Sequence, residues 1–149
     1  MRYDAELLYV AAVLHDLGLV SGFDSGRCFE EDSADAAAEV AGLAGWPAKR
    51  CDALAEAIRL HMGAVVSPED KPEAYLLSAA TALDVTGNRY GDLDTRTVEA
   101  VVAEHPRLDF KAGFTRLFVD QAVRKPGCQV AALVRNRISD RIARAPFSS

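Results

Sequence analysis

The sequence predicts an all-α fold, a compact bundle of about six to seven helices within a single domain. Half of the 149 residues are hydrophobic, yet only 7% are aromatic. β-Rich domains are instead enriched in Val, Ile, Thr and aromatic residues. Apolar residues recur at helical spacing between short Gly-, Pro- and Asp-containing segments, and we identify no convincing strand. A chain of this length can bury one substantial core.

The first three helices carry recognisable start signals. Asp4 can cap a first helix, and Asp32 or Ser33 is expected to cap a second, Ala-rich helix with the sequence ADAAAEVAGLAG. Pro47 suits the first turn of a third helix, which runs to about Met62, because the missing N–H costs little there. The apolar face of the first helix is formed by Leu7, Leu8, Ala11, Ala12 and Leu14.

The second half of the chain continues the helical pattern. A fourth helix is expected over residues 72–87, and a fifth begins at a cap of Asp94 or Thr95 and ends near His105. The segment FKAGFTRLFVDQAV forms a further helix. A Pro-Gly pair then separates a C-terminal helix, within residues 126–149, which covers the core or pairs with a second subunit as a homodimer.

Charge is unevenly distributed along the chain. The net charge is −5, but acidic residues dominate residues 1–106 and basic residues dominate residues 107–149. The basic residues are spread over a helical pattern with apolar partners and are not clustered in a run. We therefore expect two faces that attract each other within the fold or in a dimer, and no nucleic-acid partner.

The cysteines and the apolar segments favour a reduced, cytoplasmic protein without a membrane partner. Cys28, Cys51 and Cys128 lie far apart, are odd in number and form no CxxC motif, which favours free thiols over a disulfide framework. The longest apolar run, residues 7–20, is too short to span a bilayer. Acidic residues stand where a signal peptide would carry positive charge.

Polar residues interrupt several apolar helical faces and indicate where chemistry could occur. His15 and Asp16 follow AAVL, His61 ends AIRLH, and Asp84 lies in ALDV. Isolated buried charges cost several kcal/mol unless they are paired or bound to a metal. One divalent cation would compensate all of these groups, and a mixed nitrogen and oxygen set suits Zn, Mn, Fe or Mg. Alternatively, His61 is a polar residue at a helix end, and Asp84 caps or pairs with an Arg.

Two other polar features have simpler explanations. Glu30, Glu31 and Asp32 place negative charge near the start of the second helix, where the helix dipole favours it. His105, before a proline at a helix end, complements the C-terminal charge of that helix.

The segment VLHDLGL resembles the HD-domain superfamily of metal-dependent hydrolases. With CFEEDSADAAAEV, AIRLHMG, AATALDVTG and HPRLDFKAGF in this order, the chain resembles the cyanamide hydratase-like branch from about Tyr3 to Phe118. The resemblance implies an all-α HD fold around a divalent ion, Zn first, with Fe or Mn as alternatives. It implies that His15, Asp16 and Asp84 are metal ligands, that His61 and Asp16 are catalytic, that Glu30 is a catalytic pocket residue and that Lys111, with His61, contacts substrate.

The superfamily pattern is H…HD…D, and its first His lies on a helix before the dyad. This chain carries no His before His15. Three explanations are open: the chain starts late, another chain supplies the ligand, or the site is degenerate. We favour the first, which makes residues 1–149 a single HD-type domain that lacks the first family helix.

The resemblance implies hydration of a small nitrile-like substrate, of the cyanamide-to-urea type, by metal-activated water. One alternative is an HD-type phosphohydrolase acting on a nucleotide or small phosphate ester. No Lys follows the glycine of HDLG and no basic cluster surrounds the candidate ligands, although Arg107 and Lys111 could fold back. A second alternative is a non-catalytic HD-fold binding or oligomerisation module. The missing His favours that module, whereas the buried charges of Asp16 and Asp84 oppose it.

Overall fold

The computed structural model describes residues 1–63 and 65–147 and confirms the all-α prediction. Within these residues the chain forms eight α-helices, two short 3-10 helices and no strand. The elements are α1 (Ala5–Leu14), η1 (Leu17–Leu19), α2 (Phe29–Leu43), α3 (Ala48–Leu60), α4 (Pro72–Thr86), η2 (Tyr90–Asp92), α5 (Thr95–Glu104), α6 (Phe110–Arg124), α7 (Gln129–Arg135) and α8 (Ile138–Arg144).

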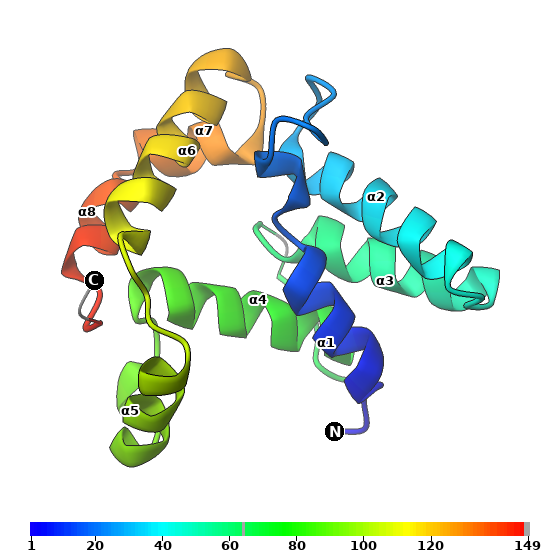
Figure 1. Ribbon diagram of the computed structural model, residues 1–149, viewed down its shortest axis with the longest axis horizontal. Coiled ribbons are helices and arrows are strands. Elements are labelled where there is room, and N and C mark those ends of the chain that lie inside the picture. The colour runs from blue at the N-terminus through cyan, green and yellow to red at the C-terminus, as the bar shows by residue number, and fades with distance from the viewer. Residues whose placement is uncertain (64, 148–149) are drawn as a thin grey trace.

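The buried apolar residues form two clusters. Figure 1 shows α2 and α3 side by side, on the opposite side of the molecule from α6, α7 and α8. The first cluster joins α1 to α4 and is rich in alanine, which lets the helices approach closely; it includes Leu7, Ala34, Ala37, Leu54, Ile58 and Leu77. The second joins the start of α2 to α6, α7 and α8 and contains Phe29, Phe114, Phe118, Val130, Ile138 and Ile142.

The helix starts confirm some predictions and correct one. Asp4 and Asp94 cap α1 and α5. Each carboxylate accepts a hydrogen bond from the backbone N–H three residues further along the chain. The prediction that Asp32 or Ser33 caps the second helix is wrong, because α2 begins at Phe29. The Asp32 carboxylate accepts instead from the backbone and hydroxyl of Ser25, so it holds the preceding loop.

Gly18 places η1 directly against α2. Its N–H donates to the Ser33 hydroxyl at 2.8 Å. A Cβ at Gly18 would lie 2.2 Å from the carbonyl oxygen of Phe29, so only glycine permits this approach. The glycine of the HDLG segment therefore fixes the turn that follows His15 and Asp16.

The single C-terminal helix expected within residues 126–149 is divided in two. α7 ends at Arg135, and Arg137 adopts a left-handed conformation with φ 60° before α8 begins. The sequence carries no glycine or proline at this break, so its local signals predict a continuous helix. The break turns α8 back against α4 and α6.

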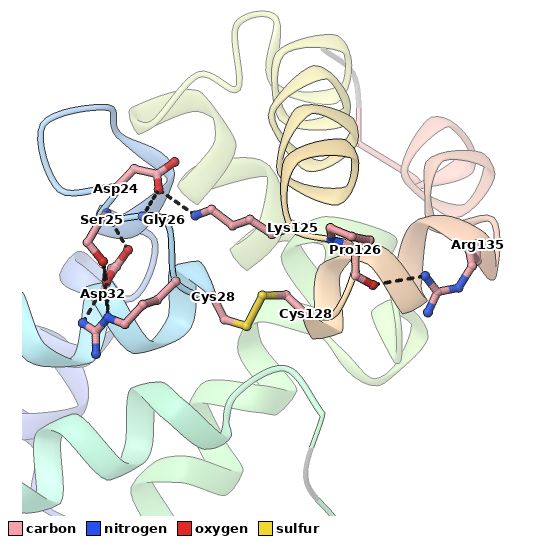
Figure 2. Close-up of a disulfide and its surroundings, with 10 residues drawn as sticks. Asp24, Ser25, Gly26, Cys28, Asp32, Lys125, Pro126, Cys128 and Arg135 are labelled. Atoms are coloured by element: carbon pink, nitrogen blue, oxygen red, sulfur yellow. Dashed lines mark hydrogen bonds and ion pairs between the residues drawn. A yellow bond between two sulfur atoms is a disulfide. The ribbon is translucent and has the colours of Figure 1, made fainter.

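The expectation of three free thiols is wrong. Cys28 and Cys128 form a disulfide, whereas Cys51 is free and buried. The bonded residues are 100 positions apart, and the fold brings the residue before α2 next to the residue before α7 (Figure 2). A pairing over this distance depends on tertiary structure and has no signature in the cysteine spacing.

The predicted attraction between the acidic and basic parts of the chain is confirmed within the fold. Asp24 lies 2.7 Å from the Lys125 ammonium and 2.9 Å from the Arg124 guanidinium. Arg107 pairs with Asp84. Each of these pairs joins the acidic segment, residues 1–106, to the basic segment that follows it.

Candidate metal centre

His15 and Asp16 lie where α1 ends. The Nδ1–H of His15 donates to the carbonyl oxygen of Ala12, in the last turn of the helix, at 2.8 Å. A carbonyl oxygen can only accept, so this bond places a proton on Nδ1, and in the neutral ring the lone pair lies on Nε2. Asp16 follows at the start of η1, and its carboxylate lies 3.2 Å from that Nε2.

His61 repeats the same arrangement at the end of α3. Its Nδ1–H donates to the carbonyl oxygen of Ile58 at 2.6 Å, and the residue is 4% exposed. The bond again leaves the Nε2 lone pair free. Two helices thus end in a histidine that is oriented by its own backbone, in the way that metal-binding histidines are fixed by a second hydrogen bond.

The three side chains converge. One potential ligand atom from each of His15, Asp16 and His61 lies within 4.8 Å of the others. The two imidazole rings are 5.1 Å apart between centroids and meet edge to face at 82°. Two oriented ring nitrogens and one carboxylate oxygen form a donor set that suits a divalent transition metal. The residues present therefore fit a metal ion.

The pKa values of the two histidines shift in opposite directions. Burial alone would lower the pKa of His15, but the hydrogen bond to Asp16 and its negative charge outweigh burial, so the pKa is raised. Burial lowers the pKa of His61. His61 is therefore neutral at neutral pH and ready to bind a cation, while protons compete at His15 as the pH falls.

A cavity of about 170 Å³ opens beside these three residues. Its walls combine a face of α4 with side chains of α6, α7 and α8, and they are mostly apolar. Beyond the three residues above, the lining consists of Met62, Ser78, Thr81, Ala82, Val85, Thr86, Phe114, Phe118, Leu133, Ile138 and Arg141. The large apolar side chains of the lining therefore belong to the second cluster or pack against it, and the candidate ligands lie on the cavity wall.

Asp84, an expected ligand, lies apart from this group. Its carboxylate pairs with Arg107, whose Nη2 also donates to the Asp84 carbonyl oxygen at 2.9 Å. The Asp84 side chain is 54% exposed, whereas that of Arg107 is 10% exposed and packs over Phe110 and Phe147. Asp84 remains close enough for its charge to raise the pKa of His15. This corresponds to the alternative in which Asp84 pairs with an arginine.

Glu30 and Lys111, both expected near substrate, are not in the described lining of the cavity. Glu30 is 9% exposed on α2, and burial raises its pKa. Its Oε2 has no hydrogen-bond partner among the described residues. The Lys111 ammonium donates to the carbonyl oxygens of Ala143 and Ala145 and so caps the C-terminus of α8.

Sequence reasoning missed the far wall of the cavity. Phe114, Phe118 and Arg141 reach it from α6 and α8, which follow the candidate ligands by many residues. The spacing of FKAGFTRLF places both phenylalanines on one helical face, but that pattern alone is equally typical of a core helix. His61 was expected to contact substrate, and the structure places it with the candidate ligands.

The fold and the site define a helical protein with an oriented His-Asp-His group in a small cavity. Residues 2–86, more than half of the chain, match the HD domain family. The chain belongs to this family, whose superfamily comprises metal-dependent hydrolases that bind divalent ions. No curated protein matches the sequence at a significant level. In the described part of the chain, no helix has the length and apolarity needed to cross a membrane.

Proposed function

We propose that this protein is a metal-dependent enzyme of the cyanamide hydratase-like branch that hydrates a small nitrile-like molecule, as in cyanamide to urea. The observation that carries the proposal is the position of the His15, Asp16 and His61 group on the wall of a small, mostly apolar cavity. Arg141 is the sole Arg or Lys in the described lining. Such a cavity suits a small uncharged molecule better than a polyanionic nucleotide.

The proposed roles follow from the geometry. His15 and His61 would hold the ion through Nε2, with Asp16 as an oxygen ligand, and zinc suits this set best, with iron or manganese as alternatives. When bound, a divalent ion polarises the substrate and lowers the pKa of water at the site. Asp16 is partly exposed and touches the His15 ring, so it can take up and release a proton as water adds across the C≡N bond.

Asp84, whose carboxylate pairs with Arg107 in the structure, is proposed as a further oxygen ligand. The helix that carries it, α4, already lines the cavity with Ala82 and Val85. A change of its side-chain rotamer away from Arg107 is the movement that this role requires. Glu30 and Lys111 stay predictions as pocket residues.

The test combines metal analysis with two assays on the full chain. The protein is loaded with zinc, manganese or iron, and bound metal is measured after dialysis. We expect one ion per chain and metal-dependent formation of urea from cyanamide, both lost in H61A and retained in H105A, which alters the exposed third histidine. Phosphate release from a nucleotide panel without urea formation would instead favour the phosphohydrolase. If the protein binds none of the three metals, the non-catalytic binding or oligomerisation module would be the remaining alternative.

A further inference from the structure

The cavity lies between two helical units. The N-terminal unit comprises α1 to α4, and it supplies His15, Asp16, His61 and one wall of the cavity. The C-terminal unit comprises α6 to α8 and supplies the opposite wall, including Phe114, Phe118 and Ile138. The distance between the two units therefore sets how open the cavity is.

The Cys28–Cys128 disulfide is a covalent link between these units. Cys28 caps the start of α2 and Cys128 caps the start of α7, and both residues are half-buried, so a thiol can reach the bond. Figure 2 shows the disulfide close to a second connection between the units, the Asp24–Lys125 ion pair. Gln121 of α6 adds a hydrogen bond to Asp24 at 3.1 Å.

The disulfide is connected to the candidate metal centre through the neighbouring residue. Phe29 follows Cys28 directly and is fully buried. Its ring centroid lies 6.2 Å from that of His61 and 5.9 Å from that of Phe118. Phe29 thus contacts the candidate ligand on one side and the far cavity wall on the other, and the disulfide fixes its backbone.

Contacts elsewhere join the units without the disulfide. Arg107, which precedes α6, pairs with Asp84 of α4, and Arg141 of α8 lies 3.5 Å from the hydroxyl of Thr86. Gly87, which ends α4 at φ 71°, approaches Pro146 so closely that a Cβ would meet its ring at 2.1 Å. These contacts keep α8 beside the end of α4 when the disulfide is broken. Loss of the disulfide therefore loosens the units mainly near Cys28 and Cys128, where the Asp24 ion pair and hydrogen bond remain as the non-covalent connection.

We propose that the Cys28–Cys128 disulfide is a redox-sensitive clasp that holds the C-terminal unit closed over the cavity. A dithiol reductant supplies two electrons and two protons; the S–S bond breaks, two thiols form at Cys28 and Cys128, and the dithiol becomes a disulfide. A small disulfide oxidant reverses the exchange. The clasp is a proposal about how the two units pack and does not depend on the proposed function. Only its expected effect on turnover rests on that function.

Hydrogen exchange on the full chain, with and without dithiothreitol, tests the clasp. On reduction we expect amides of α6 and α7 to exchange at least about tenfold faster, while those of α1 and α3 keep their rates. C128S without reductant should reproduce the reduced pattern. C51S, which removes the free buried cysteine of the first cluster, should respond to reductant as the unmodified chain does.

Thiol counting in denaturant shows whether the bond is present in the protein that is measured. One reactive thiol before reduction and three afterwards are expected. Three thiols in air-equilibrated protein would overturn the clasp, as would equal exchange in both forms. Uniform acceleration across all helices would also overturn it, because the disulfide would then stabilise the whole chain.

Turnover separates the clasp from the proposed function. Cyanamide hydration is compared between oxidised and reduced protein with one zinc ion bound in each. If the clasp acts on the cavity, the apparent KM for cyanamide changes at least about threefold while bound zinc does not. An unchanged KM despite faster exchange in α6 and α7 would overturn the effect on the cavity. Absence of urea in both forms would contradict the proposed function, and the exchange result alone would then decide the clasp.

Discussion

The region matched by the HD domain family and the C-terminal unit contribute different things to the same cavity. The matched region, residues 2–86, supplies all three members of the metal-competent group and packs through small alanine contacts. The C-terminal unit lies outside the match, packs through phenylalanine rings and forms the opposite wall. Under the proposed function, the family-matched region would hold the metal ion, and the C-terminal unit would complete the cavity that receives the substrate.

The largest expected effect is on metal binding. H15A or H61A removes one oriented ring nitrogen. Loss of a residue that only hydrogen-bonds to a metal ligand lowers metal affinity by up to about 100-fold, so loss of a ligand itself should lower zinc affinity by more than that. Isothermal titration with zinc measures the change. H105A should retain the affinity of the unmodified chain. If H61A bound zinc normally, the assignment of His61 as a ligand would be wrong.

The C-terminal unit should affect shape and stability without affecting the metal. F118A deletes a ring that is 4% exposed and lines the cavity, so the free energy of unfolding should fall by about 3–5 kcal/mol. Zinc affinity should stay within about threefold, because Phe118 lies outside the ligand group. Urea denaturation and zinc titration measure both, with the exposed neighbour V119A as control. A large loss of zinc affinity in folded F118A would contradict the division of roles.

Within the matched region, the turn after the dyad should be intolerant of a single methyl group. G18A forces a Cβ against the Phe29 carbonyl, so we expect about 3 kcal/mol loss in the free energy of unfolding. G22A, where no heavy atom lies within 4 Å, should change it by less than about 0.5 kcal/mol. Chemical denaturation of the two variants checks the contrast. If G18A and G22A had equal free energies of unfolding, η1 would not pack closely on α2.

The buried ion pair between the two units should make stability depend on acid. The Lys125 side chain lowers the pKa of Asp24 below its ordinary value of 3.8, so the pair stabilises the fold above that pH and is lost as the pH falls through the lowered pKa. D24N should therefore lose roughly 1–3 kcal/mol near neutral pH, a difference that disappears in strong acid. Denaturation at several pH values measures it, with the exposed D120N as control. A difference between D24N and the unmodified chain that did not change with pH would rule this out.

The smallest expected effect concerns Arg107, which links the two regions. R107Q releases Asp84, so zinc affinity should rise about three- to tenfold if Asp84 joins the ligands, a change of roughly 1 kcal/mol. The increase should be absent when R107Q is combined with D84N, which isolates the coupling between the two residues. R116Q, which alters an exposed pair, serves as the control. No increase in R107Q would leave Asp84 a partner of Arg107 only.

Local patterns predicted the matched region better than the C-terminal unit. The Asp4 cap, the Gly87 stop and the polar dyad at His15 are all set within a few residues, and the sequence shows them directly. The break at Arg137 and the disulfide depend on contacts between distant segments, so periodicity predicted a continuous helix and free thiols. His61 was harder to interpret, because its Nδ1 bond to the preceding turn becomes visible only in three dimensions.

The same backbone bonds have an electrostatic consequence. His15 and His61 each stand at the carboxyl end of a helix, so the C-termini of α1 and α3 meet at the candidate ligands. Each helix end carries roughly half a negative charge from its aligned peptide dipoles. The fold therefore favours a cation at this point before the Asp16 carboxylate is counted. An anionic molecule would approach the same point against that field, whereas a neutral one would not.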